Sequence, residues 1–253
     1  MTVRLVALHG FLGRASDWDG LAARLPGVDV RAVDLWHLLA DSADWRSATK
    51  KASELFFGEV AKVADSETSG AASSAIFVVG YSLGARLALG SLNASLDSRI
   101  RGCCFVSCNP GLPDHDVAGR EARRASDARW ASRIADEPEG AFWAAWDAQP
   151  VFDGSASAPR GPLPAPRQVL ARVLTACSLA GQPDLRPQLR AWPGSVLWVT
   201  GARDVRFSAI AQELHEARVP AEFAACPTAG HRVPWDDPDW FAEALRGWMA
   251  RLT

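Results

Sequence analysis

The chain has 253 residues, of which 48% are hydrophobic and 22% are charged. That is enough length and apolar content to bury one large core, which excludes a disordered chain and a small disulfide scaffold. Lys and Arg total 27 against 29 Asp and Glu. Because this balance leaves no surplus of positive charge to neutralise phosphates, we expect no nucleic-acid partner.

Short apolar runs rich in β-branched residues alternate with longer helical patterns along the chain. The runs predicted as strands are 3–8, 28–33, 75–80, 100–107, 194–200 and 220–226. The patterns predicted as helices between them are 16–25, 45–64, 83–96, 207–218 and 235–250. Such alternation is typical of an α/β fold with a mostly parallel sheet and helices on both of its faces.

The alternation stops between residues 109 and 191, where the sequence carries helical patterns and no convincing strand. The helical patterns are 119–135, 137–148, 167–180 and 184–191, with a connector rich in Pro, Gly, Ser and Ala at 150–166. A stretch of this length is too long to be a loop of a compact domain. We predict an inserted helical cap at 109–191 on a core made of residues 1–108 and 192–253.

The five cysteines include no Cys-x-x-Cys pair and no spacing typical of a zinc site, so we expect buried free thiols and no metal. At the N-terminus, His9-Gly10 follows before an apolar signal region could form, and no apolar run approaches the ~20 residues that span a bilayer. We therefore expect a cytoplasmic protein without membrane contact.

A candidate catalytic serine lies in Gly80-Tyr81-Ser82-Leu83-Gly84, between a predicted strand and a predicted helix. The serine of such an elbow sits in a strained turn with its oxygen above the sheet edge. Glycines two places to either side allow the strand and the helix to pack closely. The bare G-x-S-x-G pattern also arises from composition alone, so the strand-to-helix context is what favours a functional Ser82.

Two further residues complete a candidate Ser-Asp-His triad. Asp204 and His231 each follow a predicted strand, and their order after Ser82 is the one this architecture uses. Because the carboxyl ends of parallel strands meet at one edge of the sheet, we expect the three side chains to converge there.

The turn His9-Gly10-Phe11 follows the first predicted strand. In this architecture, the loop after that strand and the residue after the elbow serine each donate one backbone N–H to an oxyanion. Those positions are Phe11 and Leu83. An ordinary turn is plausible for His9-Gly10 taken alone, but it is a poor explanation in combination with the elbow and the triad.

Two arginines favour an anionic substrate. Arg86 lies one helical turn after Ser82 and can share its face, and Arg123 lies on the first predicted cap helix. Structural roles remain open, because Arg86 could pair with a carboxylate beneath the site and Arg123 could be solvated. Trp146 is equally consistent with a pocket wall and with the core of the cap.

The whole chain resembles the α/β-hydrolase superfamily and, within it, the 2-succinyl-6-hydroxy-2,4-cyclohexadiene-1-carboxylate (SHCHC) synthase family of menaquinone biosynthesis. The elbow and the Gly201–Asp204 and Ala229–His231 motifs belong to the superfamily at large. The stretches Trp146–Phe152 and Gln182–Leu185 are far more specific. Further matching stretches are Asn109–Leu112, Arg123–Trp130 and Ser178–Gly181.

The resemblance implies a lyase that eliminates pyruvate from 2-succinyl-5-enolpyruvyl-6-hydroxy-3-cyclohexene-1-carboxylate without a metal or organic cofactor. Ser82 would act as a general base, polarised by His231 and Asp204. Arg86 and Arg123 match arginines that hold substrate carboxylates in this family. Tyr81 and Trp146 match its pocket residues. The expected partner is therefore a small anionic substrate, bound by a monomer or a weak homo-oligomer.

Two departures from the pattern accompany the resemblance. Asp34–Leu38 replaces the D-x-P-G-H-G that superfamily members usually carry after the second strand. Where the family has a further substrate-binding arginine, the connector offers only Arg160 and Arg167, and the sequence favours neither. Two other functions stay open: a serine hydrolase acting on an ester, thioester or carbon–carbon bond with Ser82 as nucleophile, and a non-catalytic binding module on the same fold.

Overall fold

The strands form one parallel sheet in the order β2-β1-β3-β4-β5-β6. The computed structural model of the chain describes residues 2–68, 74–92, 100–156 and 161–253. Each predicted strand is present, with bounds within two residues of those expected. The strands are β1 (Thr2–Leu8), β2 (Val28–Val33), β3 (Ser74–Tyr81), β4 (Ile100–Val106), β5 (Ser195–Gly201) and β6 (Glu222–Cys226).

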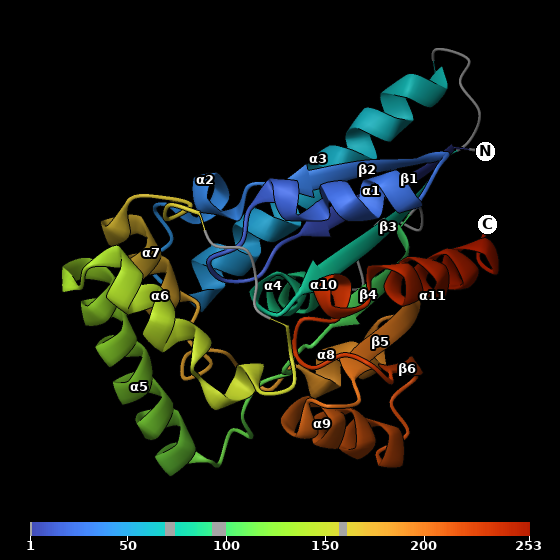
Figure 1. Cartoon of the computed structure of the whole chain (residues 1–253). Helices are drawn as coiled ribbons and strands as arrows, with labels where there is room; N and C mark the ends of the chain where they lie inside the picture. The colour runs from blue at the N-terminus through green and yellow to red at the C-terminus, as the bar shows by residue number, and fades with distance from the viewer. Residues whose placement is uncertain (1, 69–73, 93–99, 157–160) are drawn as a thin grey trace.

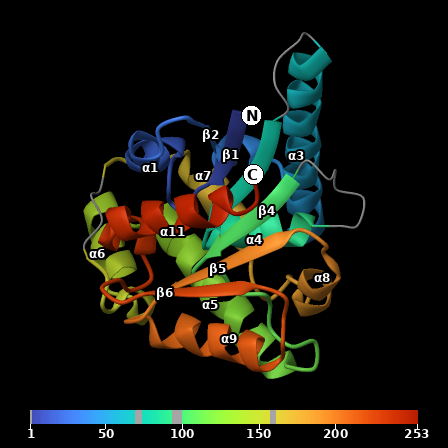
Figure 2. The ribbon, with the colours of Figure 1, turned by 90° about the vertical axis from the view of Figure 1, so that its right-hand side faces the viewer.

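Helices cover both faces of the sheet, which is why the central strands are apolar on both sides. Alternate residues of β3 enter different cores: Val78 packs on one face and Val79 on the other. Figure 2 shows α1 and α11 on one side of the sheet and α3, α4 and α8 on the other. Their bounds, with α9, are α1 (Asp19–Arg24), α3 (Trp45–Thr68), α4 (Leu83–Ser91), α8 (Arg186–Ala191), α9 (Val205–Glu216) and α11 (Pro238–Ala250). The prediction of an α/β-hydrolase fold is confirmed.

Three helices between β4 and β5 lie beyond the end of the sheet that is opposite the two chain termini (Figure 1). These are α5 (Val117–Asp136), α6 (Glu139–Asp147) and α7 (Arg167–Ala176), and we call them the cap helices. A 3-10 turn, η2 (Pro150–Phe152), follows α6. In contrast, α8 packs against α4 of the core. The described residues between β4 and β5 contain no strand, as expected, and the cap as a separate domain over 109–191 stays a prediction.

Three helical details differ from the sequence-based expectation. The pattern at 235–250 is split into α10 (Val233–Asp236) and α11, because Asp237 caps a new helix by accepting the Trp240 N–H and Pro238 starts it. A short helix that the periodicity did not predict, α2 (Leu35–Leu39), follows β2. The helix expected at 83–96 ends at Ser91, and residues 93–96 lie outside the described residues.

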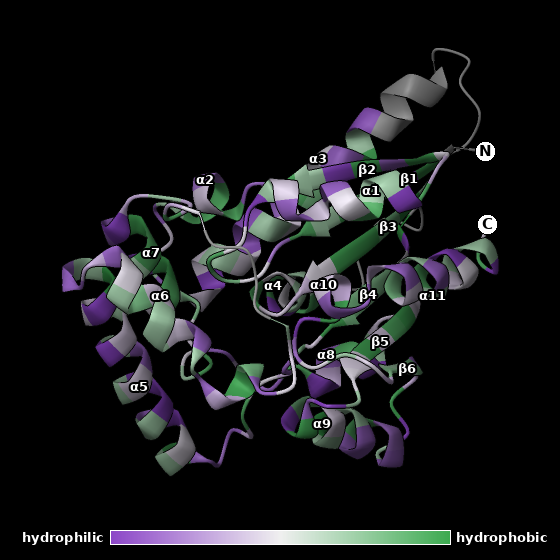
Figure 3. Cartoon of the chain, in the orientation of Figure 1, coloured by the Kyte–Doolittle hydropathy of each residue, from purple (hydrophilic) through white to green (hydrophobic). Residues whose placement is uncertain are grey.

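Hydropathy follows the layers: β3 and β5 are strongly hydrophobic, whereas much of α5 is hydrophilic (Figure 3). The described helices include none that is both long and apolar enough to cross a membrane. As predicted, the five cysteines are free and buried. Burial raises the pKa of the Cys177 thiol to about 12, so this thiol stays protonated and weakly nucleophilic at neutral pH.

Candidate active site

The elbow between β3 and α4 puts Ser82 in a strained backbone conformation, with φ 50° and ψ −107°. The two glycines around it are sterically required. A Cβ at Gly80 would meet the backbone of Ala85, and a Cβ at Gly84 would meet the carbonyl of Leu8. The two glycines therefore allow the strained strand-to-helix turn that carries Ser82. Strain of this kind is typical of functional sites.

The structure brings Asp204 and His231 together in a buried pair. His231 Nδ1 lies 2.8 Å from Asp204 Oδ2, and the two side chains are 4% and 3% exposed. Asp204 Oδ1 accepts the Phe207 N–H at 3.1 Å, so the carboxylate also caps α9. Because Nδ1 donates its proton to the carboxylate, the neutral imidazole has no proton on Nε2. Nε2 can therefore accept one.

Sequence analysis missed Ser107, which also positions His231. Ser107 has φ 48° at the end of β4, and its hydroxyl donates to the His231 carbonyl at 2.7 Å. The imidazole itself lies among aromatic rings, with centroid distances of 4.6 Å to Phe207, 5.5 Å to Tyr81 and 5.9 Å to Phe152. These contacts keep bulk water from most of the ring.

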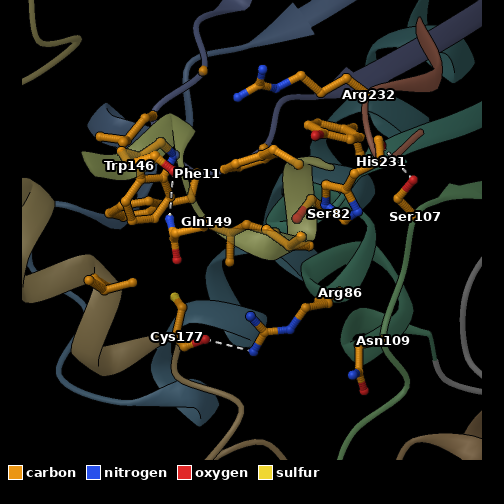
Figure 4. Close-up of a pocket in the computed structure, with 18 of the residues that line it drawn as sticks. Phe11, Ser82, Arg86, Ser107, Asn109, Trp146, Gln149, Cys177, His231 and Arg232 are labelled. Atoms are coloured by element: carbon orange, nitrogen blue, oxygen red, sulfur yellow. Dashed lines mark hydrogen bonds between the residues drawn. The ribbon is translucent and has the colours of Figure 1, made fainter. Parts of the chain in front are cut away.

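Ser82 and His231 line the same cavity, and Figure 4 shows their side chains next to each other with Ser107 on the other side of His231. Within the described part of the chain, Ser82 Oγ makes no hydrogen bond. Hydrogen bonds of this kind are often long in unliganded enzymes and tighten only when a substrate closes the site.

The cavity measures about 940 Å³ and lies between the sheet edge and the cap helices. That is the size and position typical of a small-molecule site. All predicted site residues except Asp204, which lies behind His231, line it: Phe11, Tyr81, Ser82, Leu83, Arg86, Arg123, Trp146 and His231.

Arg86 is buried at the cavity wall, where its Nε donates to Gln182 Oε1 and its Nη2 to the Cys177 carbonyl, each at 2.6 Å. Its guanidinium lies 5.1 Å from the Trp45 ring centroid. No described carboxylate lies within ion-pair distance. Burial and the charge of Arg123 lower the pKa of Arg86 to about 10, so it stays protonated at neutral pH. The cavity therefore contains a buried cation that no described carboxylate contacts at ion-pair distance.

Arg123 lies on α5 and lines the cavity from the cap side. Its Nε donates to the buried Asp127 carboxylate at 2.8 Å, and 32% of its side chain is exposed. Of the two connector candidates, Arg160 lies outside the described residues. Arg167 donates to the Ile134 carbonyl within the cap helices and is absent from the described cavity lining. Three cavity cations were not predicted: Arg14, Arg206 and Arg232.

The two predicted oxyanion donors come from the elbow itself and from the turn after β1. Leu83 is the first residue of α4, where an N–H has no partner within the helix. Phe11 lies in a turn closed by a 3.0 Å hydrogen bond from the Gly13 N–H to the Gly10 carbonyl. Both residues line the cavity. The backbone N–H groups of these two residues are therefore available to donate to a negatively charged oxygen in the cavity.

Trp146 fulfils both of the roles left open by the sequence. It lines the cavity, and its ring centroid lies 5.4 Å from that of Phe11 and 5.0 Å from that of Trp130. Phe142 is fully buried in the core of the cap helices. The cap therefore packs directly on the turn that carries Phe11.

A profile of the alpha/beta hydrolase family matches residues 5–244. The chain therefore belongs to the alpha/beta hydrolase family of enzymes.

Curated relatives narrow the comparison. The chain is 35% identical over 247 residues to the 2-succinyl-6-hydroxy-2,4-cyclohexadiene-1-carboxylate synthase of Enterobacter sp. (strain 638), covering 95% of this chain and 89% of that protein. It is 34% identical over 247 residues to the synthase of the same name from Citrobacter koseri, covering 95% and 91%.

Solved structures show the same fold. MenH from S. aureus superposes with a TM-score of 0.83 at 20% identity, covering 99% of this chain and 94% of that chain. A thermophilic esterase from Thermogutta terrifontis superposes with a TM-score of 0.70 at 19% identity, covering 99% and 90%.

Proposed function

We propose that this enzyme is an SHCHC synthase, which eliminates pyruvate from 2-succinyl-5-enolpyruvyl-6-hydroxy-3-cyclohexene-1-carboxylate. The observation that carries the proposal is the buried Arg86 guanidinium, which forms no ion pair with a described carboxylate, in the cavity that also contains Ser82 and His231. Burying a cation without a counter-ion is costly, so the cavity favours a ligand that brings a carboxylate. The names of the curated relatives support the same substrate class.

In the proposed reaction, Ser82 acts as a general base. His231, oriented by Asp204, takes the hydroxyl proton as Ser82 Oγ removes a proton from the carbon next to the succinyl carbonyl. The electrons move to form the second ring double bond, and the ring C–O bond to the enolpyruvyl group breaks. Enolpyruvate leaves and takes up a proton on carbon to become pyruvate. No acyl-enzyme forms.

The backbone supplies the electrostatic part of the proposed mechanism. Negative charge develops on the succinyl carbonyl oxygen, where the N–H groups of Phe11 and Leu83 would stabilise it. Arg86 and Arg123 would hold substrate carboxylates, with Tyr81 and Trp146 as walls. Each charge-assisted contact would be worth about 1.5–3 kcal/mol in binding.

The second candidate is a serine hydrolase, because the strained Ser82 elbow and the Asp204–His231 pair equally suit a nucleophilic serine. The two functions differ in the fate of Ser82. A hydrolase accumulates an acyl group on Ser82 that intact-protein mass spectrometry detects, whereas the proposed lyase does not.

Pyruvate release from the enolpyruvyl substrate, followed by coupled NADH oxidation, tests the proposal. Wild-type enzyme is expected to release pyruvate, and Ser82→Ala is expected to lose this activity while keeping its circular dichroism spectrum and Tm. Ser132→Ala, at an exposed position on α5, is the matched control. Faster turnover of p-nitrophenyl esters than of the enolpyruvyl substrate, with an acyl group on Ser82, would establish the hydrolase instead.

A further inference from the structure

The helix α2, which replaces the usual superfamily motif, is bonded to the segment His9–Gly13 through one side chain and one backbone N–H. The Trp36 indole N–H donates to the Gly13 carbonyl at 2.8 Å. The backbone N–H of Leu35 donates to His9 Nε2 at 3.1 Å. Trp36 is 4% exposed and is absent from the described cavity lining, so it contacts the turn from behind.

The hydrogen bonds of His9 fix its protonation. Because Nε2 accepts the Leu35 N–H, the ring proton must be on Nδ1, which lies 2.8 Å from the Gly10 carbonyl and donates to it. The same Gly10 carbonyl accepts the Gly13 N–H. The first carbonyl of the turn is therefore bonded to His9, and the last to Trp36.

The turn needs such support because its backbone is strained. Leu12 has φ 63°, a left-handed conformation that costs a non-glycine residue about 1 kcal/mol or more. Phe11, immediately before it, carries the N–H of the proposed oxyanion hole. The Phe11 ring also packs edge-on against Trp36, with centroids 5.5 Å apart. Relaxation of Leu12 would rotate the peptide units on both sides of it.

We propose that Trp36 is a positioning residue for the oxyanion-binding turn: its indole N–H holds the Gly13 carbonyl and thereby keeps the Phe11 N–H aimed at the developing negative charge. The inference rests on the proposed function, in which Phe11 donates to the succinyl carbonyl oxygen. It assigns a role to the departure at Asp34–Leu38, with Asp34 fixing the start of α2 by accepting the Trp36 N–H at 2.9 Å.

Trp36→Phe tests this assignment, because phenylalanine keeps an aromatic ring against His9 and Phe11 but has no N–H donor. An oxyanion contact acts mainly in the transition state, so kcat is expected to fall about 10- to 100-fold with KM changed less than about twofold. Trp240→Phe, on α11 and outside the described cavity lining, is the matched control and is expected to keep both values.

Unchanged kcat in Trp36→Phe, or an increase in KM that accounts for the whole loss of kcat/KM, would overturn the proposal. If the variant fails to fold, hydrogen exchange of the Trp36 indole proton in wild-type enzyme replaces it. Slow exchange is expected for a proton bonded to Gly13, and exchange at the rate of a free indole would overturn the proposal.

The proposed function and the role of Trp36 fail in different ways. Wild-type enzyme that releases no pyruvate contradicts the proposed function. The ratio of kcat in Trp36→Phe to kcat in wild-type enzyme is then measured with p-nitrophenyl acetate. The tetrahedral intermediate of this ester would be stabilised by the same turn. A reduced ratio there supports the positioning role, and an unchanged ratio contradicts it.

Discussion

The two walls of the cavity are held in different ways. On the sheet side, Ser82, Asp204 and His231 follow strands β3, β5 and β6, and they are oriented by the strained Ser82 backbone and by the 2.8 Å hydrogen bond between His231 and Asp204. On the cap side, Arg123 and Trp146 sit on α5 and α6, which meet the core through side-chain packing that includes Trp146 on Phe11 and Asp147 on Arg232. The comparison indicates that backbone geometry orients the residues on the sheet side, whereas packing between helices and core places the residues on the cap side.

The largest effect is expected for Asp204→Asn on the sheet side. An amide would orient His231 with the wrong tautomer, so kcat is expected to fall about 10³- to 10⁴-fold with little change in fold. Steady-state pyruvate release measures the loss, with Asp136→Asn, exposed on α5, as control. A kcat of Asp204→Asn above a tenth of the wild-type value would show that the Asp204 carboxylate is not needed for the reaction.

The Arg86→Met variant tests substrate recognition from the sheet side, because Arg86 lies on α4. It removes the buried charge while keeping most of the apolar stem, so kcat/KM is expected to fall about 10- to 100-fold, mainly through KM. Arg190→Met, exposed on α8, serves as control. Unchanged KM for the enolpyruvyl substrate would contradict a carboxylate-binding role.

A smaller effect is expected where the two walls meet. Arg232, next to His231, donates to Asp147 Oδ1 at 2.6 Å at the end of α6, and its guanidinium lies 4.0 Å from the Phe152 ring centroid. Arg232→Met is expected to raise KM about tenfold, because it removes the charge-assisted hydrogen bond that joins the His231 loop to the end of α6.

Asp147→Asn and the double variant complete a double-mutant cycle for this pair. The losses in the two single variants are expected to be less than additive in the double variant. Fully additive losses would show that the two side chains act independently of each other.

The smallest effect concerns the stability of the sheet-side turn. Burial lowers the pKa of His9 below its usual 6.5, so below pH 6.5 the unfolded chain binds a proton that the folded chain excludes. The contribution of neutral His9 to the free energy of unfolding is therefore fully present above pH 6.5. It is lost as the pH falls, by at most about 1.4 kcal/mol per pH unit.

The His9→Gln variant isolates this contribution in urea unfolding. It is expected to be less stable than wild type at pH 7.5, and the difference is expected to shrink by about 1 kcal/mol at pH 5.5. A difference that is constant across this range would show that His9 titrates alike in both states.

Sequence reasoning found the parts of the site that have local signals. Ser82 was predictable from the glycines around it, and Asp204 and His231 from their positions after strands. Ser107 was not, because its role comes from backbone strain and from a contact with a residue 124 positions away. Arg232 was missed for the same reason, since Asp147 is distant in sequence.

Hydrophobic periodicity also failed to predict the short helices. The five residues of α2 are too few to show an amphipathic repeat. The available signal was Asp34 directly before Leu35, which is an N-cap pattern. Similarly, Asp237-Pro238 marks the break that divides α10 from α11.

The docking of Phe152 and Asp147 onto the His231 loop has a consequence for protein engineering. A chimera with cap helices from a protein that lacks Asp147 and Phe152 would lose the acidic partner of Arg232 and a ring that shields the imidazole. Selectivity and chemistry are therefore not separable modules in this scaffold. Transplanted cap helices need to keep Asp147 and Phe152, or residue 232 must change with them.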